Sequence, residues 1–234
     1  MSSDDVVAEQ SIKAADEQNL LDPFEVRVLA VLAEKEALTP DAYPMSLNAL
    51  TNGCNQLSSR DPVMAITDST VQDVLQRLIQ RKLVAEVSQA GARVSKYEHR
   101  MRIKWTLEQD KLSILTILML RGAQTAGEIR NRVGRMHDFA SVADVEVGLQ
   151  FLIDKYPPVV GRMARAPGTK ESRYAQLLSG TDILERQEML SSSVSESTTS
   201  RTDRIEQLEQ EVARLRDALS GLTQEFEDFK KQFV

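Results

Sequence analysis

Residues Asp68 to Tyr97 read DSTVQDVLQRLIQRKLVAEVSQAGARVSKY, and this segment decides the fold. Apolar side chains recur in it at intervals of three and four residues: Val71, Val74, Leu75, Leu78 and Ile79. Polar side chains fill the positions between them: Gln72, Asp73, Gln76, Arg77 and Gln80. This spacing predicts a helix with one apolar stripe and one polar face, buried on one side only.

A basic helix end and two β-prone runs follow. The helix leads into Arg81-Lys82-Leu83, and the two runs are Val84 to Val87 and Arg93 to Tyr97, joined by a small-residue turn around Gly91. Such a turn between β-prone runs is typical of a β-hairpin. Helix, basic end and hairpin in this order predict a winged-helix unit.

Two helices are expected before this segment. Asp22, Pro23 and Glu25 match the start of a capped helix, with the proline at the first helical position and the glutamate reaching back in a capping box. Its buried stripe is predicted to hold four apolar residues: Phe24, Val28, Val31 and Leu32. A short second helix is expected from Ser46, after a proline-containing break.

The second half of the chain repeats this plan. Helix starts are predicted at three places: Thr106 with Gln109, Thr125 with Glu128, and Ser141. A second hairpin is predicted from Val159 to Met163 and from Glu171 to Leu177. Because the order of elements and the residue pattern both recur, we interpret the chain as a tandem duplication of about 80 residues.

The predicted fold is therefore mainly α with small β-hairpin wings, an α+β arrangement of two tandem winged-helix domains plus a C-terminal coiled coil. Five segments are predicted: a mobile N-terminal tail at 1–19, winged-helix domains at 20–105 and 106–180, a Ser/Thr-rich linker at 181–204 and a coiled-coil helix at 205–234.

Heptad spacing distinguishes the last segment. Its apolar residues alternate by three and four positions: Ile205, Leu208, Val212, Leu215, Leu219, Leu222, Phe226, Phe229 and Phe233. A seam of about four heptads is typical of a coiled coil and favours a homodimer. The alternative is a tail helix that packs on its own domains.

The overall composition narrows the class of protein. A net charge of −6 argues against a generally basic nucleic-acid binder, although residues 20 to 180 hold 21 basic and 18 acidic side chains. The longest apolar run, Leu112 to Leu120, is too short to span a bilayer. The acidic N-terminus has no apolar run behind it, so we predict a cytoplasmic protein that does not contact membranes.

Catalytic residues are not apparent in this sequence. It contains no phosphate-binding glycine loop, Cys-x-x-Cys pair or His-Glu-x-x-His motif. The single cysteine, Cys54, is interpreted as a small buried residue, and His99 and His137 as hydrogen-bonded linker residues. We therefore predict a protein that is not an enzyme and has no metal and no cofactor.

Binding to double-stranded DNA is the first functional hypothesis. Eleven basic residues are the candidates for phosphate contacts: Arg77, Arg81, Lys82, Arg93, Lys96, Arg130, Arg132, Arg162, Arg165, Lys170 and Arg173. The third helices argue against it, because Asp73 in one copy and Asp144 with Glu146 in the other would face the groove. Carboxylates there repel phosphates, and the alternative is that the third helices bind protein.

An amide-rich stretch supplies the second hypothesis, a protein-interaction scaffold. The segment NALTNGCNQ, residues Asn48 to Gln56, is followed by RDPV, and its asparagines, glycine and threonine are poor helix formers. The candidates for an interaction loop are Asn52, Asn55, Gln56, Arg60 and Asp61. The alternative is an internal hydrogen-bond network that braces the loop.

Several of these strings together resemble the YceH family of bacterial proteins. They are LNALTNGCNQ with RDPV, then KYEHR, LRG, TAGEIRNR and MHDFA, within residues 20 to 180. The resemblance implies tandem winged helices with a variable C-terminal extension, and it implies no activity. The sequence departs from the family pattern where Gly53 replaces an alanine, Leu57 a lysine and Ala123 a proline. The change at Leu57 removes a charge and weakens the case for an anion site in this loop.

Overall fold

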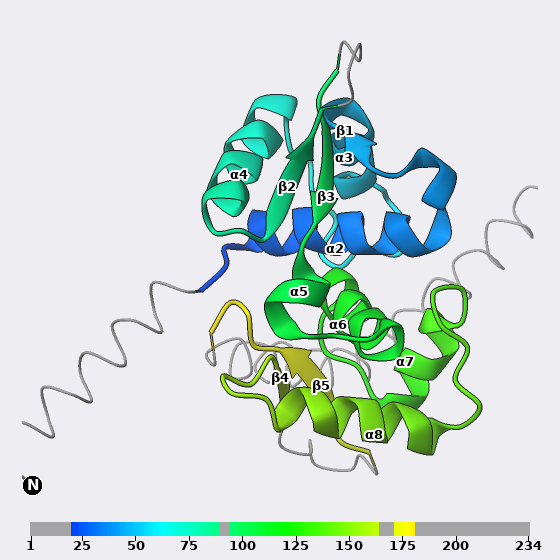
Figure 1. Cartoon of the computed structure of the whole chain (residues 1–234). Coiled ribbons are helices and arrows are strands. Elements are labelled where there is room, and N and C mark those ends of the chain that lie inside the picture. Colours follow the sequence, from blue (N-terminus) through cyan, green and yellow to red (C-terminus); the bar gives the residue numbers. More distant parts are fainter. Residues whose placement is uncertain (1–19, 89–93, 164–170, 181–234) are drawn as a thin grey trace, which may run out of the picture. The chain divides into compact units, whose positions relative to one another are not determined.

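The computed structural model describes residues 20–88, 94–163 and 171–180, which form a mixed fold of helices and small antiparallel sheets (Figure 1). All of them lie within one compact unit. The α+β class predicted from the sequence is confirmed in this general form. The tail at 1–19, the linker at 181–204 and the coiled coil at 205–234 lie outside the described residues.

In the first half, the residues that the structure describes form four helices, a short 3-10 helix and one sheet. In chain order they are α2 (Pro23–Leu38), the 3-10 helix η1 (Pro40–Ala42), β1 (Met45–Ser46), α3 (Leu47–Cys54), α4 (Asp68–Gln80), β2 (Val84–Val87), β3 (Lys96–His99) and α5 (Met101–Trp105). The second half comprises α6 (Gln109–Arg121), α7 (Ala126–Val133), α8 (Val142–Ile153), β4 (Val160–Arg162) and β5 (Tyr174–Gln176).

Helix α2 starts as predicted. Asp22 Oδ1 accepts hydrogen bonds from the backbone N–H groups of Phe24 and Glu25, both at 2.8 Å, and Glu25 Oε2 accepts from the Asp22 N–H at 3.0 Å. This reciprocal capping box satisfies backbone donors that have no partner within the helix.

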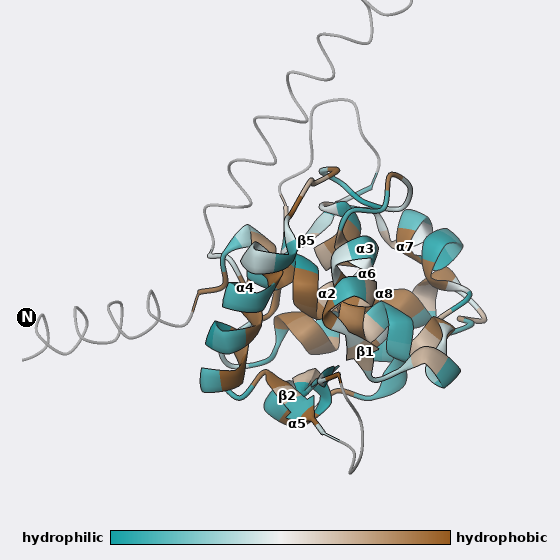
Figure 2. Ribbon diagram, turned by 90° about the horizontal axis from the view of Figure 1, so that it is seen from above, coloured by the Kyte–Doolittle hydropathy of each residue, from teal (hydrophilic) through white to brown (hydrophobic). Residues whose placement is uncertain are grey.

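The predicted buried stripe of α2 is wrong in one residue and too narrow overall. Phe24 is 42% exposed, whereas every residue from Glu25 to Glu34 is buried. The helix packs against α3, α4 and α6, so most of its circumference is covered (Figure 2). A helix surrounded in this way needs no single stripe, and Phe24 lies on the exposed side of the first turn.

Helix α4 follows the predicted pattern. Thr67 caps it by accepting from the Thr70 N–H, and its four principal stripe residues are buried: Val71, Val74, Leu75 and Leu78. Ile79 is partly buried, and the polar face turns outward, as the alternating colours of α4 in Figure 2 show.

The hairpin after α4 forms with a shifted second strand. Val84 pairs with His99 and Val87 with Lys96, so β3 spans Lys96–His99 instead of the predicted Arg93 to Tyr97. A further strand, β1, was not predicted; Met45 pairs with Tyr97, which gives the order β1-β3-β2. A two-residue strand carries too little alternation to be recognised in sequence.

The second half contains the predicted short helix, third helix and hairpin. Thr125 with Glu128 caps α7, and Ser141 with Asp144 caps α8 in the same reciprocal way. Strands β4 and β5 pair antiparallel, with Gly161 opposite Ala175.

The predicted start of α6 is wrong. Thr106 is not a cap of α6 but the left-handed residue that ends α5, with φ of 49°. Glu108 is the N-cap residue of α6, and the Gln109 side chain is drawn toward Arg102 and Ser113. Because the short helix α5 was not predicted, the threonine was assigned to the wrong helix.

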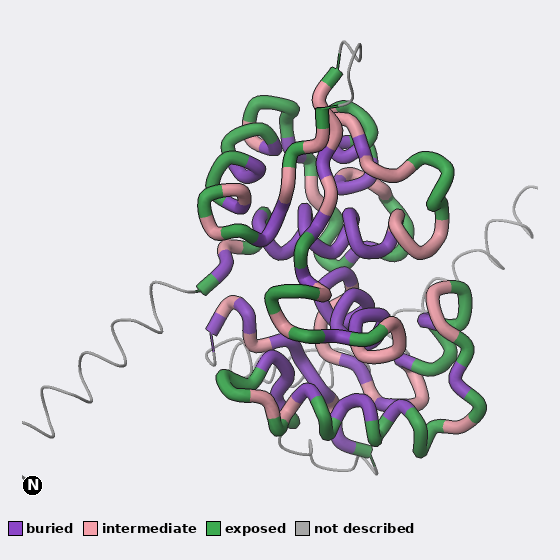
Figure 3. Tube along the Cα trace, viewed as in Figure 1, coloured by how far each residue is buried: buried purple, intermediate pink, exposed green. Residues whose placement is uncertain are grey.

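One continuous hydrophobic core runs through both halves, and α2 packs against α6 within it. In Figure 3 the buried residues follow the inner sides of the helices, while the outer sides of α4 and α8 are exposed. The proposed division near residue 105 stays a prediction. No helix in the described ranges is long and apolar enough to cross a membrane.

Candidate functional site

The arginines of α4 predicted to contact DNA are ion-paired with the start of α2. Arg77 Nη2 lies 2.6 Å from Asp22 Oδ2, and its Nε lies 3.1 Å from Glu25 Oε1. Arg81 Nη1 lies 3.0 Å from the other oxygen of Glu25 and donates to the Leu20 carbonyl at 3.0 Å. These guanidinium groups are already compensated by two carboxylates, which reduces their attraction for a phosphate backbone.

The other first-half candidates lie in separate elements. Lys82 is exposed directly after α4, whereas Lys96 is half-buried in β3. The structure therefore brings together Arg77 and Arg81, through Glu25, but not this pair of lysines. Three candidates lie outside the described residues: Arg93, Arg165 and Lys170.

Two second-half candidates share the carboxylate of Glu128. Arg173 Nη2 lies 2.7 Å from Glu128 Oε2, while Arg132 Nη2 lies 3.9 Å from its Oε1. Arg132 also donates to Gln124 Oε1 at 2.8 Å. Glu128 thus compensates Arg173 closely and Arg132 only loosely.

Arg130 and Arg162 retain their positive charge at the surface. Arg130 donates to the carbonyl oxygens of Phe139 at 3.2 Å and Ala140 at 3.0 Å, which braces the α7–α8 connection without cancelling the charge. Arg162 is exposed in β4. In the described part of the chain, neither arginine has a carboxylate within ion-pair distance.

The carboxylates of the third helices lie at the surface as predicted. Asp73 is exposed on α4, and Asp144 and Glu146 are exposed on α8. Asp144 also serves the helix cap, because its Oδ2 accepts from the Ser141 N–H at 2.9 Å. These helices therefore present negative charge at the positions where a groove-binding helix needs neutral or basic side chains.

The amide-rich stretch is mostly helix α3, and its end is held internally. Asn55 Nδ2 donates to the Ile66 carbonyl at 2.7 Å, and Asn55 Oδ1 accepts from the Ile66 N–H at 2.8 Å. Gln56 Oε1 accepts from Arg60 Nη2 at 2.7 Å. Gln56 and Arg60 are therefore in direct contact, Asn55 is held separately by the Ile66 backbone, and Asn52 and Asp61 are exposed.

Two buried arginines hold the C-terminal end of α3. Arg60 donates through Nη1 and Nη2 to the two carboxylate oxygens of Glu34, and through Nε to the Gly53 carbonyl at 3.2 Å. Arg27, only 1% exposed, donates to the Cys54 carbonyl at 3.1 Å. Both carbonyls lie at the negative end of the helix dipole, so these arginines are structural.

The Cys54 side chain is buried beside these arginines. Burial raises the pKa of its thiol to about 12. The residue is therefore a neutral thiol at physiological pH, in keeping with the small buried side chain expected from the sequence.

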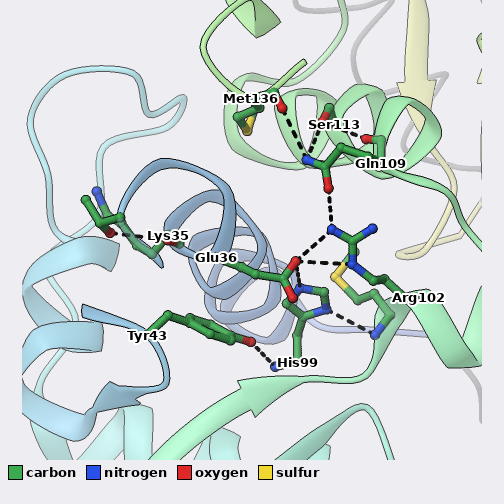
Figure 4. Close-up of polar contacts among 10 residues, drawn as sticks. Lys35, Glu36, Tyr43, His99, Arg102, Gln109, Ser113 and Met136 are labelled. Atoms are coloured by element: carbon green, nitrogen blue, oxygen red, sulfur yellow. Dashed lines mark hydrogen bonds and ion pairs between the residues drawn. The ribbon is translucent and has the colours of Figure 1, made fainter. Parts of the chain in front are cut away.

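A polar network joins the two halves, and we call its members Glu36, His99, Arg102, Gln109 and Met136 the junction network (Figure 4). Glu36 Oε2 lies 3.2 Å from His99 Nε2 and accepts from Arg102 Nη2 at 2.9 Å. Arg102 continues to Gln109 Oε1, and Gln109 Nε2 donates to the Met136 carbonyl at 3.2 Å. The network thereby connects α2 with α5, α6 and the residues that follow α7.

The hydrogen bonds of the junction network favour a structural role. His99 Nδ1 accepts from the Met101 N–H at 3.2 Å, so Nε2 carries the hydrogen and donates to Glu36. The hydrogen bond from His99, with those from Arg102, lowers the pKa of Glu36 to about 2. Such a carboxylate is a weak base, and both nitrogens of the histidine ring are occupied.

An apolar outer face on α8 was missed by the sequence reasoning. We define the α8 outer face as Ala143, Val147 and Phe151, which lie four residues apart on the exposed side of the helix. Val147 is 70% exposed and Phe151 is 43% exposed. The sequence does show this face, as a second row of apolar residues on the same helix, beside the buried row of Val145, Leu149 and Leu152.

Two lysines flank the aromatic ring of this face. Lys111 Nζ lies 5.4 Å and Lys155 Nζ 4.9 Å from the centroid of the Phe151 ring, within the range of cation–π attraction. Positive charge therefore adjoins the α8 outer face at Phe151.

Other predicted sites are not covered by the structure. The dimer seam from Ile205 to Phe233 lies outside the described residues. Among the residues that are described, no group of three or more His, Cys, Asp or Glu side chains is arranged to hold a metal ion.

Comparison with known proteins gives long matches. Residues 21–169 match the family model described as "Protein of unknown function, DUF480". The chain is 65% identical over 217 residues to a UPF0502 protein of Herminiimonas arsenicoxydans, covering 92% of each chain. It is 41% identical over 210 residues to a UPF0502 protein of Shewanella halifaxensis, covering 86% of this chain and 98% of that protein.

These near full-length matches define the chain as a member of a family of bacterial proteins. It belongs to the UPF0502 family, and the resemblance to YceH proteins noted from its motifs is confirmed.

Proposed function

We propose that the chain is a non-enzymatic protein of two tandem winged-helix units that acts by binding a partner protein through the α8 outer face. One observation carries this proposal: Val147 and Phe151 are exposed side by side on the third helix of the second half. Neighbouring exposed apolar side chains rimmed by charge are typical of interaction sites.

The order of elements supports the winged-helix assignment. Helices α2, α3 and α4 precede the hairpin β2–β3, and α6, α7 and α8 precede the hairpin β4–β5. In both halves a capped third helix leads into an antiparallel strand pair. This order is the one in which the third helix of a winged helix is the recognition element.

The expected partner is an amphipathic helix. A flat helix face with apolar side chains four residues apart is complemented by the apolar ridge of a second helix. Burial of Val147 and Phe151 contributes roughly 25 cal/mol for each Å² of apolar surface removed from water. Carboxylates on the partner helix would pair with Lys155 at the end of α8.

The charges near the third helices favour protein over DNA as the main partner. On α8, Asp144 and Glu146 adjoin the outer face and would repel phosphates. On α4, Arg77 is compensated by Asp22 and Glu25.

DNA contact by the rest of the second half is the second candidate function. The exposed guanidinium groups of Arg130 and Arg162, which lack carboxylate partners in the described ranges, favour it. A gel-shift assay over a salt series tests it, because phosphate contacts give a steep decrease of affinity with salt. Binding that is absent even at low salt contradicts this second candidate.

The heptad seam supports a homodimer in which two such arms act together. Pairing two weak sites raises the overall affinity through effective concentration. Light scattering on the full chain and on a chain ending near Ser200 tests it. The expected result is a dimer for the full chain and a monomer for the short one, and two monomers contradict it.

Substitution on the α8 outer face tests the main proposal. Val147→Lys is expected to weaken partner binding by at least about tenfold, because it places a charge in the centre of an apolar contact. The matched control is Gln76→Lys, at an exposed position on α4. Equal partner recovery with both variants and the unmodified chain would count against the assignment.

A further inference from the structure

A second, separate site is indicated at Arg121, the last residue of α6. Its Nη2 lies 2.5 Å from Ser59 Oγ. Its Nε is inaccessible to solvent and has no hydrogen-bond partner among the described residues. No described carboxylate lies within ion-pair distance of this guanidinium, in contrast to Arg60, Arg77 and Arg102.

Further positive charge surrounds this arginine. Burial, together with the charges of Arg132 and Arg60, lowers the pKa of Arg121. Arg60 is fully engaged by Glu34, but the nearest carboxylate oxygen to Arg132 is 3.9 Å away, on Glu128. The positive charges of Arg121 and Arg132 are therefore undercompensated.

The loop beside Arg121 is fixed in place. Ser59 adopts a left-handed backbone conformation, with φ of 62°, which is uncommon for a residue with a side chain. The Asp61 N–H donates to the Leu120 carbonyl at 2.8 Å and ties this loop to the end of α6. The hydroxyl and the two arginines thus come from the α3–α4 connection, α6 and α7.

We propose that Arg121, Arg132 and Ser59 bind a phosphate group. A guanidinium group presents its N–H donors as a rigid fork that matches the oxygens of phosphate. A tetrahedral dianion supplies acceptors in several directions, for the terminal Nη donors of Arg121, for the second guanidinium and for the hydroxyl, and it offsets the mutual repulsion of the arginines. The site is independent of the α8 outer face.

Titration of the full chain with inorganic phosphate tests this site. The measurements are the Arg121 Nε–H signal in NMR spectra and the thermal midpoint, against chloride of equal ionic strength. Phosphate is expected to shift that signal and raise the midpoint, as a ligand that binds only the folded state does. The absence of both responses would overturn the proposal.

Variants locate the site. Arg121→Gln and Arg132→Gln are each expected to weaken phosphate binding about tenfold or more, because each removes a charged donor. Arg132 is exposed, so its variant reports on binding if the Arg121 variant fails to fold. The control is Arg100→Gln, which removes an exposed arginine that pairs with Glu98. Equal phosphate affinity in all three variants would overturn the assignment.

Competition distinguishes the sources of phosphate. A nucleoside triphosphate that displaces inorganic phosphate identifies a small-molecule ligand, whereas displacement by a DNA duplex, lost in Arg121→Gln, identifies a nucleic-acid backbone. Either result supports a phosphate site. Binding of phosphate that depends on neither arginine would show an adventitious ion only and would refute it.

Discussion

Glu34 and Arg60 form a buried, bidentate ion pair: Arg60 Nη2 lies 2.6 Å from Glu34 Oε2, and Nη1 lies 3.1 Å from Oε1. The Arg60 side chain is fully inaccessible, and that of Glu34 is 10% exposed. The pair locks helix α2 to the loop after α3. It also explains how a stretch rich in asparagine and glycine keeps a fixed conformation.

Removal of Arg60 should destabilise the protein strongly. Arg60→Ala removes the bidentate partner of the Glu34 carboxylate, which keeps only the looser contact with Lys35 Nζ at 3.5 Å, and it leaves the Gly53 carbonyl without the Arg60 donor. Loss of one member of a buried pair costs about 3–5 kcal/mol. The control is Arg100→Ala, which removes an exposed pair with Glu98 worth about 1 kcal/mol or less. Urea unfolding measures the free energy of unfolding of both variants. Equal decreases in that free energy for Arg60→Ala and Arg100→Ala would contradict a structural role for Arg60.

Two glycine-to-alanine substitutions should change the stability of the protein in opposite directions. A Cβ at Gly148 would lie 2.5 Å from Ile114 Cδ1 in the core, and such overpacking costs about 1–3 kcal/mol. A Cβ at Gly127 meets only Thr125 Oγ1, at 3.9 Å, so Gly127→Ala should stabilise α7 by about 0.4–1 kcal/mol. Thermal unfolding of the two variants tests this, and a stabilising Gly148→Ala would show that α8 packs more loosely against α6.

The junction network should make stability dependent on pH. The folded-state pKa of Glu36 is lowered from 4.5 to about 2, so its stabilising effect is fully present above about pH 4.5 and is lost as pH falls toward 2. Glu36→Gln should therefore be most destabilising near neutral pH, and the difference from the unmodified chain should shrink between about pH 4.5 and 2.

Denaturant curves at several pH values provide the measurement for Glu36. Asp41→Asn, in the exposed 3-10 helix, is the control and should change stability little across this range. A difference for Glu36→Gln that stays constant from neutral to acid pH would show that its hydrogen bonds do not depend on its charge.

If the chain binds DNA, its arginines should contribute unequally. Arg77→Gln should leave the salt dependence of binding unchanged, because Arg77 is paired with Asp22 and Glu25. Arg130→Gln should reduce the slope of log affinity against log salt by about 0.9, the value for one phosphate contact. A larger change in salt dependence from Arg77→Gln than from Arg130→Gln would contradict this expectation and would indicate that α4 contacts the DNA.

The sequence predicted the regular elements well where pattern and capping agree. The Asp22 and Thr125 capping boxes, the α4 stripe and both hairpins follow from short-range physics that a single chain displays. The errors come from tertiary context. Phe24 was placed inside because periodicity alone does not show how much of α2 is covered, and Thr106 was assigned to α6 because α5 is a single short helix.

Candidate binding residues were harder to predict, because residues far away in the sequence determine whether an arginine's charge is compensated by a carboxylate. Nothing in the sequence around Arg77 reveals that Asp22, 55 positions earlier, pairs with it. Arg60 could not be distinguished from a surface arginine for the same reason. The α8 outer face was visible only as an extra apolar row, and a pattern search that stops at the buried row overlooks Val147 and Phe151.

Site-specific photo-cross-linking from the α8 outer face tests the central proposal most directly. A photoreactive residue at position 147 in the full chain, with position 76 on α4 as the control, is activated in living cells that express the chain. We predict one discrete protein adduct from position 147. We predict no such adduct from position 76, and none from position 147 when the chain also carries Phe151→Lys. Protein adducts of equal yield from both positions, or none from position 147, would contradict it.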